Sequence, residues 1–175
     1  NEYKEQLWDR FKEASSKINK KHQEHFDNIK EEQKRNLELK TQLCEKTEEL
    51  ADAKRTTRKE WAASSLELIE IQKVWKTIGF APKKENTKIY ERFRAACDKF
   101  FENKKEFYLA VKTEMENNLQ AKIALCVQAE AIQDSEEWKK ATNELIALQK
   151  QWKEIGAVPR KQSDLVWKRF RAACD

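Results

Sequence analysis

The chain has 175 residues, of which 38% are charged and 39% hydrophobic, and its formal net charge is +5. This composition is too apolar for a disordered chain and too polar for one large globular core, which favours slender helical packing with much exposed surface. No apolar run approaches the ~20 residues needed to span a bilayer, and the N-terminal residues do not form a signal peptide. We therefore expect a cytoplasmic protein without membrane insertion.

Residues 1–30 resemble the segments that follow two later turns. Leu7 to Phe11 repeats the pattern of Ile89 to Phe93 and of Val166 to Phe170. We interpret residues 1–30 as the end of a preceding repeat and the chain as part of a longer array.

Two long segments have the apolar spacing of amphipathic helices. From Leu7 to Leu50, apolar residues recur mostly three, four or seven positions apart, with no Gly or Pro. This spacing predicts a helix of about 45 residues. A clearer pattern from Ile89 to Ile132 predicts a second long helix.

A shorter helix is predicted after each long one. Thr57-Arg-Lys-Glu60 has the spacing of a capping box, and Asp134-Ser-Glu-Glu137 retains a cap residue and the Glu. Tryptophans then recur at the heptad spacing of a packed core, at Trp61, Trp75, Trp138 and Trp152. Stacking on nucleic-acid bases is the alternative use of these four rings.

The only two glycines and two prolines occur in two related turns. The first is Trp75-Lys-Thr-Ile-Gly-Phe-Ala-Pro-Lys-Lys84, and the second, 77 positions later, is Trp152-Lys-Glu-Ile-Gly-Ala-Val-Pro-Arg-Lys161. We expect Gly79 and Gly156 to end their helices with positive φ, and the prolines to prevent the helices from continuing. Asn86 and Ser163 are the expected caps of the helices that follow.

These elements predict an all-α fold without a β-sheet. Short connections require neighbouring helices to run antiparallel, so each repeat is expected to be a three-helix bundle. Residues 31–110 form the first complete repeat and residues 111–175 a second repeat, truncated at its C-terminus. Long connecting helices shared between tandem bundles would make the protein elongated, with the connectivity of spectrin repeats.

Catalytic and metal chemistry find little support in the sequence. His22 and His25 have no nearby cysteine pair, and neither Cys97 nor Cys174 has a His in its repeat to act as a base. Two isolated glycines exclude phosphate-binding Gly-rich loops. We predict no enzyme activity, no catalytic, cofactor-binding or metal-binding residue, no cofactor and no small-molecule substrate, and we expect reduced cysteines.

Positive charge is concentrated at the two turns. The windows Lys73–Arg94 and Lys150–Arg171 each contain seven basic and two acidic residues. A helix N-terminus adds partial positive charge, so each turn is a candidate anion site. The alternative is that these side chains only solubilise a loop. The candidate anion- or partner-binding residues are Lys83, Lys84, Arg92, Arg94, Arg160, Lys161, Arg169 and Arg171.

The turns and the segments after them resemble a known repeat family. Trp152 to Lys161 and Leu165 to Asp175, with their twin at Trp75 to Phe101, are similar to the bacterial "domain of unknown function 349" repeats. The resemblance implies cytoplasmic, all-helical tandem repeats with no established catalytic residue, cofactor or substrate. The N-terminal copy departs from the pattern, with Ser15 at the place of the cysteine.

Two functional hypotheses follow. The first is a non-enzymatic scaffold or interaction rod with an unidentified protein partner. The second is a polyanion-binding protein that contacts RNA or DNA through the basic turns.

Overall fold

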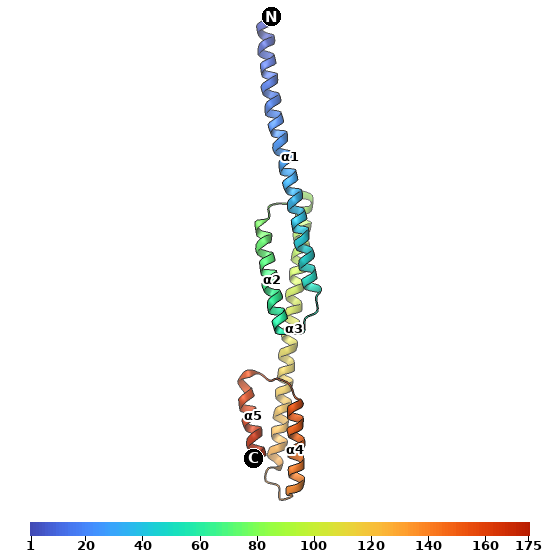
Figure 1. The fold of residues 1–175 in the computed structure, drawn as a ribbon, viewed down its shortest axis with the longest axis vertical. Helices are drawn as coiled ribbons and strands as arrows, with labels where there is room; N and C mark the ends of the chain where they lie inside the picture. Colours follow the sequence, from blue (N-terminus) through green and yellow to red (C-terminus); the bar gives the residue numbers. More distant parts are fainter. The chain divides into compact units, whose positions relative to one another are not determined.

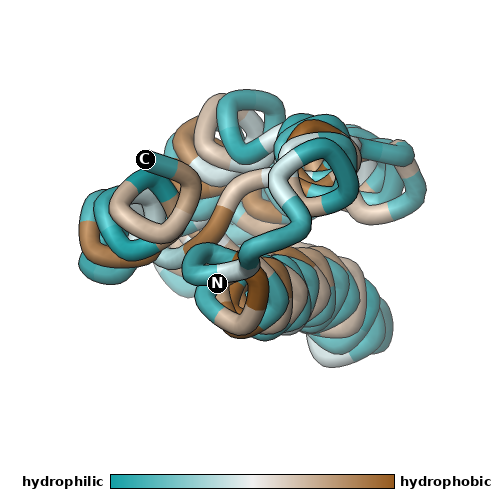
Figure 2. Tube along the Cα trace, turned by 90° about the horizontal axis from the view of Figure 1, so that it is seen from below, coloured by the Kyte–Doolittle hydropathy of each residue, from teal (hydrophilic) through white to brown (hydrophobic).

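The computed structural model describes all 175 residues and contains five helices and no strand. The helices are α1 (Glu2–Asp52), α2 (Arg58–Thr77), α3 (Lys83–Ile132), α4 (Trp138–Glu154) and α5 (Arg160–Cys174) (Figure 1). The predicted all-α fold is confirmed, and α1 and α3 span the two predicted long helices. Hydrophilic and hydrophobic residues alternate along the helices (Figure 2). None of the five is both long and apolar enough to cross a membrane.

The chain divides into two compact units, Asn1–Lys104 and Lys105–Asp175. In the first unit, the second half of α1, α2 and the first part of α3 lie side by side and alternate in direction (Figure 1). In the second unit, the last part of α3, α4 and α5 do the same. Each unit therefore brings three helical segments into contact, and α3 contributes to both.

In the first unit, the core lies where the three segments meet. Leu68 of α2, Phe100 of α3 and Cys44 of α1 are fully buried. The buried residues of α1 begin only at Lys40. The first half of this helix extends past α2 and α3 and leaves its apolar side chains exposed.

The core of the second unit is smaller. Cys126 and Ala129 of α3 are fully buried, and Leu148, Trp152 and Phe170 pack against them from α4 and α5. Apolar side chains drive this packing because each square ångström removed from water contributes about 25 cal/mol.

The capping box of α2 is confirmed, with one difference from its usual form. The Thr57 hydroxyl accepts from the Glu60 amide at 3.2 Å, and the Glu60 carboxylate accepts from the amide of Thr56, one residue before the cap. The corresponding prediction for α4 is wrong. That helix begins at Trp138 with Glu137 at its cap position and no side-chain cap hydrogen bond.

The prediction that all four tryptophans belong to the core is wrong for Trp138. Trp61, Trp75 and Trp152 are at most 9% exposed, whereas Trp138 is 79% exposed. Trp61 packs against Phe100, with ring centroids 5.5 Å apart.

The expected positive φ of the two glycines is also wrong, because no residue of the chain has a positive-φ backbone. Helices α2 and α4 instead end in extended residues, Ile78 and Ile155. The expected caps are misplaced as well. Helices α3 and α5 begin directly after the prolines, and Asn86 lies within α3, where its side chain accepts from the Ala81 amide at 3.1 Å.

Candidate partner-binding and anion-binding surface

Each turn is held by an asparagine from the long helix of its unit. Asn36 Nδ2 donates to the carbonyl of Phe80 at 3.0 Å, and Asn118 Nδ2 donates to that of Ala157 at 2.8 Å. A Cβ on Gly79 would lie 3.0 Å from Asn36 Nδ2. The glycine is therefore present because its missing side chain leaves room for the asparagine.

The helix that follows each turn begins with amides that have no intrahelical acceptor. The Pro82 carbonyl accepts from the amides of Glu85 and Asn86, both at 2.9 Å, which leaves those of Lys83 and Lys84. A helix N-terminus with free amides attracts negative charge.

The second turn repeats this geometry. The Pro159 carbonyl accepts from the amides of Gln162 at 3.0 Å and Ser163 at 3.1 Å, which leaves those of Arg160 and Lys161. The two turns thus combine free amides with basic side chains in the same way.

Four of the eight predicted site residues occupy these helix starts. The side chains of Lys83, Lys84, Arg160 and Lys161 are exposed. The ion pairs of the structure involve other residues, so these four charges remain available to an external anion.

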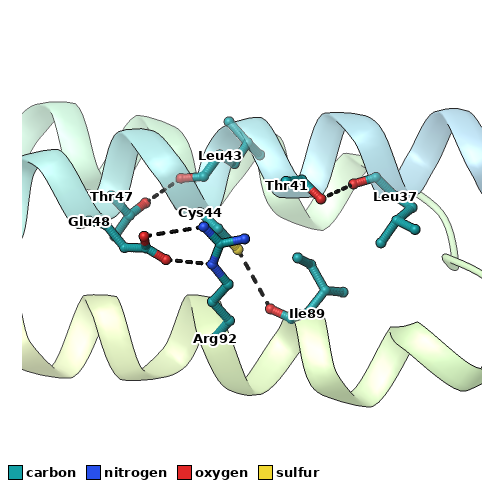
Figure 3. A network of polar contacts seen from close by, with 8 residues as sticks. All are labelled: Leu37, Thr41, Leu43, Cys44, Thr47, Glu48, Ile89 and Arg92. Atoms are coloured by element: carbon teal, nitrogen blue, oxygen red, sulfur yellow. Dashed lines mark hydrogen bonds and ion pairs between the residues drawn. The ribbon is translucent and has the colours of Figure 1, made fainter.

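Arg92 and Arg169, two more predicted site residues, bind carboxylates within their own units. Arg92 Nε and Nη2 donate to the two oxygens of Glu48 at 2.6 and 3.2 Å (Figure 3). Arg169 binds Glu130 in the same way, at 2.6 and 3.0 Å. These hydrogen bonds raise the pKa of both guanidinium groups and lower the pKa of Glu130. Both arginines link the long helix to the third helical segment, and their charges are already compensated.

A buried thiol lies beside each of these ion pairs. Cys44 Sγ donates to the carbonyl of Ile89 at 3.6 Å, as Figure 3 shows, and Cys126 Sγ donates to that of Val166 at 3.6 Å. Burial raises the pKa of Cys44 to about 11 and also raises that of Cys126. Since only the thiolate is a strong nucleophile, these groups act as protonated hydrogen-bond donors.

The tryptophan of each turn is enclosed between a lysine and a phenylalanine. In the first unit, Trp75 stacks on Phe93 with centroids 4.1 Å apart, and Lys40 Nζ lies 5.1 Å from a Trp75 ring centroid. The second unit repeats this arrangement with Lys122, Trp152 and Phe170, at 4.8 Å for the cation and 4.4 Å for the stack. These indoles are therefore used in packing and are not available for base stacking.

The last two predicted residues, Arg94 and Arg171, lie on the outer side of α3 and α5. Arg171 borders a cavity of about 440 Å³ between α4 and α5, which Trp152, Trp167 and Phe170 also line. Trp167 is 47% exposed. Sequence reasoning missed Trp167 as a surface residue. The signal that could have found it is the aromatic residue three positions before each Phe of the repeat, Tyr90 before Glu-Arg-Phe and Trp167 before Lys-Arg-Phe.

Sequence comparison identifies the two copies. The family described as Domain of Unknown Function (DUF349) matches residues 6–84 and 88–161. The chain belongs to the DUF349 family. No curated protein and no solved structure matches it.

The two DUF349 matches are out of phase with the compact units. Each match begins in a long helix, includes the Trp-bearing helix and ends just after the Gly-Pro turn. The contacts that close the first unit, such as Arg92 with Glu48, join residues of different matches. One DUF349 copy therefore completes its core only with the start of the next copy.

Proposed function

We propose that this DUF349 chain is a non-enzymatic helical repeat scaffold that binds a protein partner. The proposal depends on one observation. Residues that make contacts between helices are identical in the two units, whereas exposed residues at equivalent places differ. The contacts between helices use identical residues in both units: Asn36 and Asn118, Lys40 and Lys122, Cys44 and Cys126, Glu48 and Glu130, Trp75 and Trp152, Arg92 and Arg169, and Phe93 and Phe170.

The outward positions differ at equivalent places. Phe80, which is 76% exposed, corresponds to Ala157, and Lys88 corresponds to Leu165, which is 67% exposed. Repeat proteins use a common interior to hold a surface whose residues are free to differ between repeats. This division of roles supports a binding scaffold.

The cavity between α4 and α5 is the surface that best fits a partner segment. Its lining combines the exposed Trp167 with the buried Trp152 and Phe170. Lys153, Arg171 and Asp175 border it, and Arg171 Nε lies 4.0 Å from the Asp175 carboxylate. Aromatic and Arg side chains contribute most of the binding energy at protein interfaces. We expect the partner segment to carry an apolar anchor flanked by acidic residues.

A capture experiment tests this surface. The purified chain is immobilised and incubated with nuclease-treated extract. The proteins that it retains are compared between wild type, Trp167→Asp and Arg171→Glu. Leu66→Asp, at a leucine of α2 that is 67% exposed and lies outside the cavity, is the matched control. A protein retained by wild type and control but reduced at least tenfold by both cavity variants supports the proposal. Capture that is equal in all four proteins refutes it.

A second candidate function is polyanion binding through the turns. The observation that favours it is the repeated combination of free amides with four uncompensated cations, Lys83, Lys84, Arg160 and Lys161. Phosphate contacts of this kind give binding that weakens steeply with salt and depends little on base sequence.

Charge reversal distinguishes this candidate from non-specific attraction. The affinity for a fluorescent single-stranded RNA is measured between about 50 and 200 mM salt, the range over which affinity from phosphate contacts falls steeply. Reversal of the four turn cations to Glu is expected to reduce the affinity at least tenfold and to flatten the salt dependence. Reversal of Lys4, Lys12, Lys17 and Lys20 in α1 changes the net charge equally. Equal losses in both variants would rule out a role for the turns.

A further inference from the structure

The first half of α1 presents an apolar face that no other part of the chain covers. Leu7 is 49%, Phe11 63% and Ile18 56% exposed. Phe11 stacks only on Trp8 of its own helix, with centroids 5.7 Å apart. Large apolar side chains lined up on one helix face normally mark an interaction surface.

The two units show how this same face is used elsewhere in the chain. Residues 7, 11 and 18 correspond, 82 positions later, to Ile89, Phe93 and Phe100. Those three residues are at most 7% exposed, because α2 and the second half of α1 cover them. The α1 face therefore has the pattern of a third bundle segment without its two partners.

The charged residues beside this face match as well. Arg10 corresponds to Arg92, which binds Glu48, and Lys17 corresponds to Lys99, which binds Asp52. Glu48 and Asp52 are four residues apart on one helix. In this structure Arg10 and Lys17 form no ion pair.

We propose that the α1 face formed by Leu7, Phe11, Ala14 and Ile18 binds a helical hairpin of this same repeat type. The first helix of the hairpin carries two carboxylates four residues apart, for Arg10 and Lys17. Its second helix carries a Trp that stacks on Phe11, as Trp75 stacks on Phe93.

The hairpin is not one of those within residues 1–175. The hairpin of α1 and α2 is occupied by α3, through the Trp75–Phe93 stack, and that of α3 and α4 is occupied by α5, through the Trp152–Phe170 stack. A second copy of the chain would have to open one of its own cores to supply a hairpin. The occupant is therefore an additional DUF349-type hairpin.

The test supplies such a hairpin and measures the protection of α1. A copy of residues 34–82 is fused directly before Asn1. The added Pro82 then precedes Phe11 by the same number of residues as the native Pro82 precedes Phe93, so the added turn is in register with Phe11. Hydrogen exchange of the amides of residues 7–18 is compared between the fused and unfused chains. We expect exchange to slow at least tenfold in the fusion.

Three variants give the result its specificity. Phe11→Asp is expected to abolish the protection. Phe26→Asp is the control and should leave the protection unchanged. Phe26 is similarly exposed (59%), but its counterpart Tyr108 is 36% exposed and so is not covered in the first unit. Arg10→Glu is expected to weaken the protection, and Glu48→Arg in the added segment to restore it.

Three results would overturn the inference. The first is unchanged exchange in the fusion, and the second is protection that survives Phe11→Asp. The third is a Phe11-dependent dimer of the unfused chain in sedimentation, which would assign the face to a second copy.

Discussion

Replacing Gly79 with Ala separates two reasons for a glycine at the end of α2. A glycine that must adopt positive φ is destabilised by any side chain. Gly79 has ordinary φ, and an added Cβ would lie 3.0 Å from Asn36 Nδ2. We therefore expect the effect of Gly79→Ala to depend on Asn36.

The magnitudes follow from two opposing terms. Displacing Asn36 loses its hydrogen bond to Phe80, which contributes about 0.5–1.5 kcal/mol to the free energy of unfolding. Ala instead of Gly restricts the unfolded chain and gains about 0.4–1 kcal/mol. In the natural chain the net effect of the substitution should thus lie between a gain of about 0.5 and a loss of about 1 kcal/mol. In an Asn36→Ala background, only the gain remains and Gly79→Ala should stabilise.

Urea denaturation of the four proteins in this cycle, followed by circular dichroism, gives the coupling energy. We expect about 1 kcal/mol between the two positions. Gly156 and Asn118 provide an independent repetition, because a Cβ on Gly156 would lie 3.1 Å from Asn118 Nδ2. A loss of stability from Gly79→Ala that is the same with and without Asn36 would refute the reasoning.

Two further predictions concern the cores. Trp61→Ala should destabilise the first unit by about 3–5 kcal/mol, because it leaves a cavity beside Phe100. Trp138→Ala should change stability by at most ~0.5 kcal/mol. Denaturation of both variants measures these losses, and similar losses would show that Trp138 is buried. Because burial raises the pKa of Cys44 from 9.0 to about 11, the folded chain retains a proton that the unfolded chain releases. Stability should therefore decrease as the pH rises from 9 to 11, by up to ~1.4 kcal/mol per pH unit from this thiol. Cys44→Ala should show a shallower decrease than the natural chain, and parallel pH profiles would contradict the assignment.

The phase difference between DUF349 matches and compact units has a physical consequence. The core of the first unit needs α3, which belongs to the second match. An excised single match would leave the Trp75 face without Phe93 and the Glu48 carboxylate without Arg92. Neighbouring copies are therefore coupled through shared helices, as in other repeat proteins whose stability depends on nearest-neighbour interfaces.

Much of the candidate site was predictable because it depends on local sequence. Lys83, Lys84, Arg160 and Lys161 were predictable as a basic cluster directly after each proline, but not as the first residues of α3 and α5, because Asn86 and Ser163 were expected to cap these helices. The ion pair of Arg92 was not predictable, because its partner Glu48 lies 44 residues away on another helix. Charge counting treats the two arginines of the ion pairs as free cations, and only their partners show that they are compensated.

The sequence by itself determined the helices, since apolar periodicity, a capping box and two prolines act over a few residues. It also determined the repeat, through which equivalent residues can be compared. Tertiary structure alone decided what each equivalent residue does. Gly79 makes room for an asparagine from α1, and Arg92 binds the Glu48 carboxylate of α1, 44 residues away. These outcomes depend on contacts between segments far apart in the chain, which no local pattern specifies.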